Sequence, residues 1–238
     1  MKITYLFHSG FMVELDNNLF IFDYFKDNCK KNRYRDCGQL KPEDMPKDKN
    51  VYIFVSHGHY DHYDKEILTF NADNVNYIFY KEIRVKNEQD NIYYMNPYET
   101  LIIDDINIKT YGSTDEGISF LISAESKTIF HAGDLNWWHW EGETPDEKEY
   151  AKKAFLSEIE KITENNIDIA FFPVDPRLEH AYYMGGEYFI EKIKPKIFIP
   201  MHFQDVYDVT DKFKKHMSNK TGIEILTIHE RGEIIYKD

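Results

Sequence analysis

The sequence predicts an α/β fold in which sheets built from strand hairpins carry helices on their outer faces. Three features support this. The first 23 residues are rich in β-forming side chains, residues 51–55 form an apolar run as long as a buried strand, and helical and strand patterns alternate after residue 144. Because the composition does not change abruptly along the chain, we expect one domain over residues 1–238.

Short β-rich runs separated by turn residues predict the strands of the first half of the chain. Asp64 is in place to cap a short helix over residues 65–70. The polar, proline-containing residues 24–50 are interpreted as a long loop. The expected strands are residues 2–7, 11–15, 19–22, 51–55 and 77–80.

Residues 92–131 hold a series of β-branched and aromatic runs, for which successive hairpins are the simplest account. These runs are residues 92–95, 100–103, 106–111, 118–123 and 128–131. Thr144 and Pro145 predict the start of a helix that ends near Asn165, because proline is favoured in a first helical turn. The remaining elements are strands 167–172, 196–200, 224–228 and 233–236, and helices 185–193 and 209–218.

The charge balance argues against anionic partners. With 29 basic and 42 acidic residues, the formal net charge is 29 − 42 = −13. Such a surface repels phosphate backbones and anionic lipid heads, so neither a nucleic acid nor a membrane is expected as a partner. The densest basic stretch, residues 30–35, is interpreted as a solvated loop. Because neither a signal peptide nor an apolar run of roughly 18 residues is recognisable, we expect a cytoplasmic enzyme.

The two cysteines, Cys29 and Cys37, are too few for a disulfide scaffold in a chain of this size. We expect reduced thiols. A local disulfide and a metal clip are the alternatives, and the second lacks a further pair of cysteines.

The residues that indicate chemistry follow the apolar run 51–55. His57, His59, Asp61 and His62 lie within six residues, and this many polar groups are costly to place there without a partner. Imidazole and carboxylate suit zinc, iron or manganese. The two-residue step puts His57 and His59 on one side of an extended backbone, so both can reach one ion. Asp61 and His62 can then reach a second ion. The alternative is a polar loop whose histidines are satisfied by hydrogen bonds.

This segment, residues 56–62, resembles the metal-binding signature of the metallo-β-lactamase superfamily. Two further segments agree in order: residues 129–134 are similar to the strand that ends in Gly-Asp, and residues 195–202 to the strand that ends in the last metal histidine. Residues 7–11 and 21–23 look like the opening of the branch that includes ascorbate-6-phosphate lactonase. The resemblance spans nearly the whole chain and implies a four-layer αβ/βα sandwich with hydrolase activity.

The resemblance also implies a metal site. Asp134 would bridge two ions, and Asp61 would both bind metal and orient the attacking water or accept its proton. Zinc is the expected cation, with manganese and iron as alternatives and one or two ions bound. The family usually has a further histidine on the hairpin before the Gly-Asp strand, but residues 109–117 contain none. We therefore expect the side formed by Asp61, His62 and His202 to be the better formed. The full set of implied metal ligands is His57, His59, Asp61, His62, Asp134 and His202.

Other residues are weaker candidates. Asp23 is expected to accept a hydrogen bond from a ligating imidazole, with the closing of a turn as the alternative. His8 and Trp137 are expected to line a substrate pocket, although Trp137 suits core packing equally well. Arg177 can hold a substrate carboxylate or phosphate, but an ion pair within the chain is favoured.

The function predicted from these observations is hydrolysis, by metal-activated water, of a small phosphorylated or lactone-like metabolite. A metal-binding metabolite sensor with little turnover is the alternative from another class. A phosphodiesterase acting on nucleic acid would need a basic surface that is not seen, and a redox di-iron protein is a third alternative. A homo-oligomer is compatible with the sequence.

Overall fold

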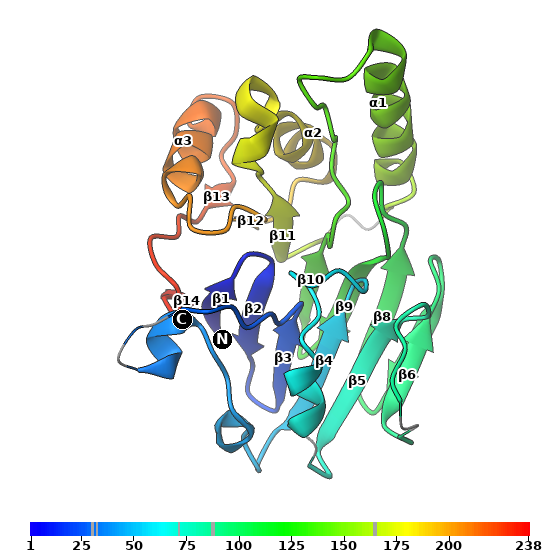
Figure 1. Ribbon diagram of the computed structural model, residues 1–238, viewed down its shortest axis with the longest axis vertical. Helices are drawn as coiled ribbons and strands as arrows, with labels where there is room; N and C mark the ends of the chain where they lie inside the picture. The colour runs from blue at the N-terminus through cyan, green and yellow to red at the C-terminus, as the bar shows by residue number, and fades with distance from the viewer. Residues whose placement is uncertain (30, 32, 71, 87–88, 164–165) are drawn as a thin grey trace. The chain divides into compact units, whose positions relative to one another are not determined.

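The computed structural model describes residues 1–29, 31, 33–70, 72–86, 89–163 and 166–238. They form two compact units. The first unit comprises Met1–Asn96 together with Ile228–Asp238, and the second comprises Pro97–Thr227. Each unit contains one sheet of seven strands, counted over the described residues (Figure 1). The single domain over residues 1–238 stays a prediction.

The sheet of the first unit has the strand order β14-β1-β2-β3-β4-β5-β6. Its strands from β14 to β3 pair antiparallel, and those from β3 to β6 pair parallel. Strand β6 was expected in a hairpin series with the strands that follow it, which is wrong, because it pairs parallel with β5 instead. The bounds are β1 Lys2–Phe7, β2 Gly10–Glu14, β3 Asn18–Phe22, β4 Asn50–Val55, β5 Val75–Tyr80, β6 Ile92–Met95 and β14 Ile234–Lys237.

The loop between β3 and β4 covers part of this sheet. It contains two short 3₁₀ helices, η1 Tyr34–Cys37 and η2 Pro42–Asp44. Leu40 and Met45 from this loop join a buried cluster with residues of β3, β4 and β5. A third 3₁₀ helix, η3 Lys65–Thr69, adds Ile67 to the cluster, and Asp64 caps it as predicted by accepting the Glu66 N–H. The apolar run 51–55 is fully buried in β4, as expected for a strand covered on both faces.

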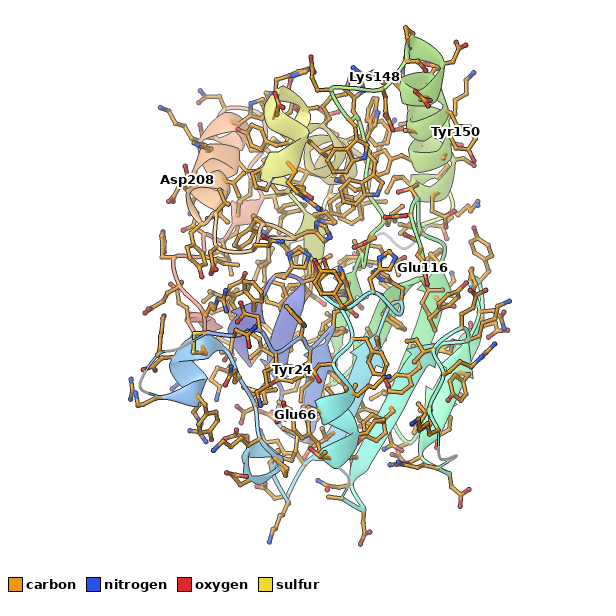
Figure 2. All side chains as sticks on the ribbon, in the orientation of Figure 1. Tyr24, Glu66, Glu116, Lys148, Tyr150 and Asp208 are labelled. Atoms are coloured by element: carbon orange, nitrogen blue, oxygen red, sulfur yellow. A yellow bond between two sulfur atoms is a disulfide. The ribbon has the colours of Figure 1, made fainter. Side chains whose placement is uncertain are left out.

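The expectation of two reduced thiols is wrong, because Cys29 and Cys37 form a disulfide (Figure 2). The turn of η1 brings their Cα atoms to 5.7 Å, a separation that a disulfide spans. Gly38 follows directly with φ 69°, and a Cβ atom there would lie 1.8 Å from the Leu6 carbonyl oxygen. The loop backbone therefore packs directly on β1.

The sheet of the second unit has the order β13-β12-β11-β10-β9-β8-β7. Strands β7 to β10 form antiparallel hairpins as predicted, and β10 to β13 pair parallel. The strands are β7 Thr100–Ile103, β8 Ile106–Tyr111, β9 Ser119–Ala124, β10 Lys127–His131, β11 Ile169–Pro173, β12 Ile197–Met201 and β13 Glu224–Ile225.

Among the described residues, three α-helices and one 3₁₀ helix accompany this sheet: α1 Pro145–Ile159, α2 Met184–Ile193, α3 Asp208–Met217 and η4 Pro176–Ala181. Thr144 caps α1 and forms a capping box with Glu147, so the helix begins where proline predicted it. It ends at Ile159, before the predicted end, and residues 164–165 of that prediction lie outside the described residues. In the described part of the chain, every helix is too short or too polar to cross a bilayer.

The two sheets share one arrangement, in which an antiparallel half continues into a parallel half. The carboxyl ends of adjacent parallel strands meet at one sheet edge, which is where α/β proteins place their sites. In the first unit, Asp23 follows β3 and Ser56 follows β4. In the second, Asp175 follows β11 and His202 follows β12. The predicted α/β class is confirmed, and its parallel halves position the candidate site residues.

Candidate functional site

In the first unit, the carboxylate of Asp23 organises the predicted histidine cluster. Asp23 is fully buried and has a left-handed backbone, with φ 40°. It accepts hydrogen bonds from the Ser56 N–H at 2.8 Å and the Ser56 hydroxyl at 2.7 Å, and lies 2.7 Å from His62 Nδ1. An imidazole that donates through Nδ1 keeps its lone pair on Nε2, which is the form that binds metal. The predicted contact between Asp23 and a histidine of the cluster is present.

His57 and His59 lie next to each other, but not for the predicted reason. The chain leaves the extended conformation after β4 and turns, since both His62 and Tyr63 donate their N–H groups to the His59 carbonyl oxygen. This turn brings His57 Nε2 to 3.0 Å from His59 Nδ1. The other nitrogen of His57 lies 2.9 Å from the Ser56 hydroxyl. Local turn geometry, not strand periodicity, therefore places the two imidazoles next to each other.

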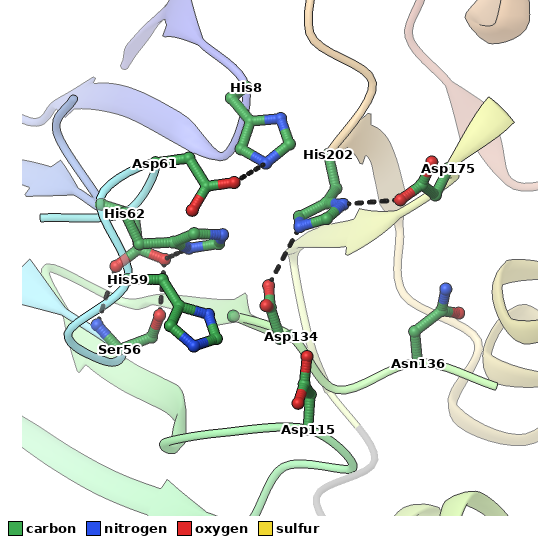
Figure 3. Close-up of polar contacts among 12 residues, drawn as sticks. His8, Ser56, His59, Asp61, His62, Asp115, Asp134, Asn136, Asp175 and His202 are labelled. Atoms are coloured by element: carbon green, nitrogen blue, oxygen red, sulfur yellow. Dashed lines mark hydrogen bonds and ion pairs between the residues drawn. The ribbon is translucent and has the colours of Figure 1, made fainter. Parts of the chain in front are cut away.

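His8 belongs to the same cluster. It lies in the tight turn between β1 and β2 with φ 56°, and its side chain is buried. Its Nε2 atom is 3.4 Å from Asp61 Oδ2 (Figure 3). His8, Asp61 and His62 each offer a ligand atom, and these atoms lie within 4.8 Å of one another. The sequence predicted His8 only as a residue that lines the substrate pocket. The structure adds that it can act as a donor to a cation.

The electrostatics of this cluster keep Asp61 ionised. Burial tends to raise the pKa of Asp61, but the hydrogen bond from His8 and the charges of His62 and His8 outweigh it. The pKa of Asp61 therefore lies well below its ordinary value of 3.8. At neutral pH the cluster combines a carboxylate with imidazole nitrogens.

In the second unit, His202 has a comparable environment. It follows β12 with φ 68° and is buried. Its Nδ1 atom lies 2.9 Å from Asp175 Oδ2, and its Nε2 atom lies 3.2 Å from Asp134 Oδ1 (Figure 3). Asp134 follows β10 after a turn in which Gly133 has φ 54°. Two predicted ligands, Asp134 and His202, are thus neighbours in this unit.

Sequence reasoning missed Asp175, which is fully buried. Arg177 binds it with Nε at 2.9 Å and Nη2 at 2.5 Å, so the favoured ion pair of Arg177 is present. Burial raises the pKa of Asp175, but the hydrogen bonds from His202 and Arg177 dominate and lower it to about 2. One signal could have found this residue: like Asp23, it is an aspartate shortly after a predominantly apolar strand.

The tryptophans after Asp134 differ in their surroundings. Trp137 packs on Phe155 of α1 and Tyr188 of α2, with ring centroids 5.9 and 6.4 Å away, and its place in a substrate pocket stays a prediction. Trp138 donates its indole N–H to the Asp134 carbonyl oxygen at 3.0 Å and contacts the His202 ring at 5.4 Å. Trp138 is thus the tryptophan that packs against predicted ligands.

The chemistry of these donors fits a divalent transition-metal ion. Imidazole nitrogens and carboxylate oxygens are the ligand types that such ions prefer. Two of the histidines have their second nitrogen hydrogen-bonded to a buried carboxylate, as ligating histidines usually do. Four of the six predicted ligands lie in the first unit, namely His57, His59, Asp61 and His62. The other two, Asp134 and His202, lie in the second.

Comparison with known proteins supports this interpretation. No model of a known protein family matches the chain. The chain is 26% identical to a UPF0173 metal-dependent hydrolase of Bacillus cereus strain AH187, over 99% of both chains. Its structure is similar to that of Igni18, a metallo hydrolase of Ignicoccus hospitalis, with a TM-score of 0.71, 18% identity and coverage of 100% and 98%. It also resembles the metallo-β-lactamase fold protein YhfI of Bacillus subtilis, with a TM-score of 0.62, 11% identity and 98% coverage of both chains.

These similarities confirm the predicted fold and the predicted resemblance, and they do not single out the ascorbate-6-phosphate lactonase branch. The protein has the metallo-β-lactamase fold, and proteins that it matches over nearly their whole length include a metal-dependent hydrolase of Bacillus cereus and the metallo hydrolase Igni18.

Proposed function

We propose that the protein hydrolyses a small metabolite with a phosphorylated or lactone-like group, using a bound divalent metal. One observation carries this proposal: the buried His8 and His62 and the partly buried Asp61 offer three ligand atoms within 4.8 Å of one another. A solvent-exposed polar loop would not need to bury two imidazoles beside an ionised carboxylate, since burial without a partner is costly. The relatives named as metal-dependent hydrolases add independent support.

The proposed ligands are the six residues implied by the sequence, and their assignment to one centre stays a prediction. A bound divalent ion, for which zinc is our first choice, supplies Lewis acidity and lowers the pKa of coordinated water. Asp61 orients the attacking water and accepts its proton. Asp23 and Asp175 each hold one imidazole in the orientation and tautomer that expose Nε2.

A small substrate is proposed in preference to a nucleic acid because the net charge of −13 repels polyphosphates. The absence of a histidine from residues 109–117 is the feature that favours the sensor alternative, which the turnover experiment below tests. A cytoplasmic location stays a prediction, because the Cys29–Cys37 disulfide is typical of oxidising compartments.

The experiment compares metal-free protein with protein reloaded with zinc, manganese or iron, on aliphatic lactones, phosphate monoesters and phosphate diesters. We expect hydrolysis only after reloading, and its loss in Asp61→Ala. Asp73→Ala changes an exposed carboxylate of the same unit and should keep full activity. Equal turnover by metal-free protein, or full turnover by Asp61→Ala, would refute the proposal.

A further inference from the structure

We propose that the substrate carries a planar aromatic ring next to an uncharged lactone or ester, and that this ring packs on Tyr60. The inference rests on the proposed hydrolase function and narrows its substrate class. Of the two proposed substrate classes, it favours lactone-like metabolites over phosphorylated ones.

A row of three aromatic rings, Phe7, Phe25 and Tyr60, runs beside the histidine cluster of the first unit. Phe7 directly precedes His8 and is buried. Its ring lies 6.0 Å from that of Phe25, which in turn lies 5.8 Å from that of Tyr60. The row therefore leads from a donor of the cluster to the surface.

Tyr60 is the exposed end of this row. It stands between His59 and Asp61 in the turn that aligns the imidazoles, and its side chain is 74% exposed. The edge-to-face contact with Phe25, at an interplanar angle of 81°, orients the Tyr60 ring while leaving most of its surface in water. A large aromatic ring held in water between two predicted metal-binding residues can stack on a planar ligand. Exposure alone does not distinguish Tyr60, since Tyr150 on α1 is exposed to a similar extent. Tyr60 differs from Tyr150 in lying between two predicted metal ligands.

The charges beside these rings disfavour a phosphorylated substrate. Phosphate recognition relies on arginine and lysine side chains that are available to the ligand. The Arg231 guanidinium is buried, binds Asp27 and lies 3.6 Å from the Phe7 ring centroid. In the second unit, Arg177 is bound by Asp175. Both guanidinium groups are thus paired with carboxylates, Arg231 in a buried position and Arg177 with a side chain that is 53% exposed, and the net charge of −13 repels anions at longer range.

The second unit shows the same preference independently. Trp138, which contacts His202, stacks on Trp140 with centroids 5.7 Å apart and an interplanar angle of 3°. Each unit thus places an aromatic pair beside a predicted ligand histidine. Trp138 itself is buried, and aromatic side chains of this kind are a common lining of small-ligand sites.

The kinetic test uses two six-membered lactones, dihydrocoumarin with a fused benzene ring and δ-valerolactone without one. For zinc-loaded Tyr60→Ala, we expect KM for dihydrocoumarin to rise about 2- to 10-fold, with kcat and the δ-valerolactone KM unchanged. Tyr60→Phe should retain the wild-type values, and Tyr150→Ala, the matched exposed tyrosine, should change neither substrate. An equal KM change for both lactones, or none, would overturn the inference, as would a higher kcat/KM for 4-nitrophenyl phosphate than for dihydrocoumarin.

A binding measurement separates this inference from the proposed function. Coumarin, an aromatic lactone stable in neutral water, is titrated into metal-free protein and followed by saturation-transfer NMR. Contact with wild type that weakens in Tyr60→Ala supports the aromatic site even if no lactone is hydrolysed, in which case the hydrolase proposal alone fails. Metal-dependent lactone hydrolysis without Tyr60-dependent coumarin binding would support the proposed hydrolase function and refute the aromatic site at Tyr60.

Discussion

Asp175 lies 2.9 Å from Nδ1 of His202 and holds this imidazole from the end of the neighbouring parallel strand. The first unit has the same arrangement: Asp23 follows β3, His62 follows β4, and Asp23 Oδ2 lies 2.7 Å from His62 Nδ1. Both contacts follow from topology, because adjacent parallel strands bring their carboxyl ends together. The two carboxylates differ in one respect: Arg177 also binds Asp175, whereas Ser56 binds Asp23.

Replacing Asp175 with Asn should weaken both metal binding and the fold. The amide keeps the shape but removes the charge that Arg177 and His202 share, and losing a hydrogen-bonded charge at a buried position costs about 1 to 3 kcal/mol of unfolding free energy. We expect zinc affinity to fall about 10- to 100-fold. Chelator competition and urea unfolding measure the two effects. Asp208→Asn, at an exposed pair with Lys212, should leave both zinc affinity and stability close to those of the wild type. Wild-type zinc affinity in Asp175→Asn would contradict the positioning role.

His8→Ala should lower zinc affinity, because His8 lies against Asp61 and within ligand distance of the same group. The expected loss is about 10- to 100-fold if His8 supports the centre. Equilibrium dialysis with a zinc-binding dye measures it. His229→Ala, which changes an exposed histidine of the same unit, is the matched control. Unchanged zinc binding with a raised KM would return His8 to its predicted role in the substrate pocket.

Acid should weaken the attachment of α3 to α2 through Glu187. His216 Nε2 lies 2.8 Å from this carboxylate, and Lys220 also binds it. Burial raises the pKa of Glu187, but these hydrogen bonds and charges outweigh it, so the pKa lies below its ordinary value of 4.5. A lowered carboxyl pKa stabilises the folded state above the ordinary value, and this stability is lost as the pH falls below it.

The measurement is urea unfolding of wild type and Glu187→Gln between pH 7 and pH 3. We expect a difference of about 0.5 to 1 kcal/mol in unfolding free energy at pH 7 that shrinks below pH 4.5. Glu149→Gln, on the exposed face of α1, should show no such trend. A difference that grows on acidification would have the wrong sign.

Removal of the disulfide should destabilise the loop between β3 and β4. The bond joins residues eight apart, and closing a loop of this size contributes about 2 to 3 kcal/mol. The double variant Cys29→Ser, Cys37→Ser should lose this amount of unfolding free energy. Thiol titration of unfolded, unreduced wild type should find no reactive thiol. Two reactive thiols in protein purified without reductant would restore the original expectation from the sequence.

Local patterns predicted most elements of the fold. The run 51–55 identified β4 because five consecutive apolar residues suit a strand buried on both faces. Thr144 and Pro145 located the start of α1 because capping depends on neighbouring residues alone. Strand β6 was assigned to the wrong neighbours, since pairing depends on partners that are distant in sequence.

The sequence by itself determined the α/β class, the order of the elements and the histidine-rich turn after β4, because each depends on the pattern of residues that are neighbours in the chain. Only the tertiary structure decided that His8 lies against Asp61, that Asp175 holds His202 and that the two cysteines are joined. These contacts link residues on different strands and loops. Their geometry arises from strand pairing and chain turns, neither of which the spacing of residues encodes.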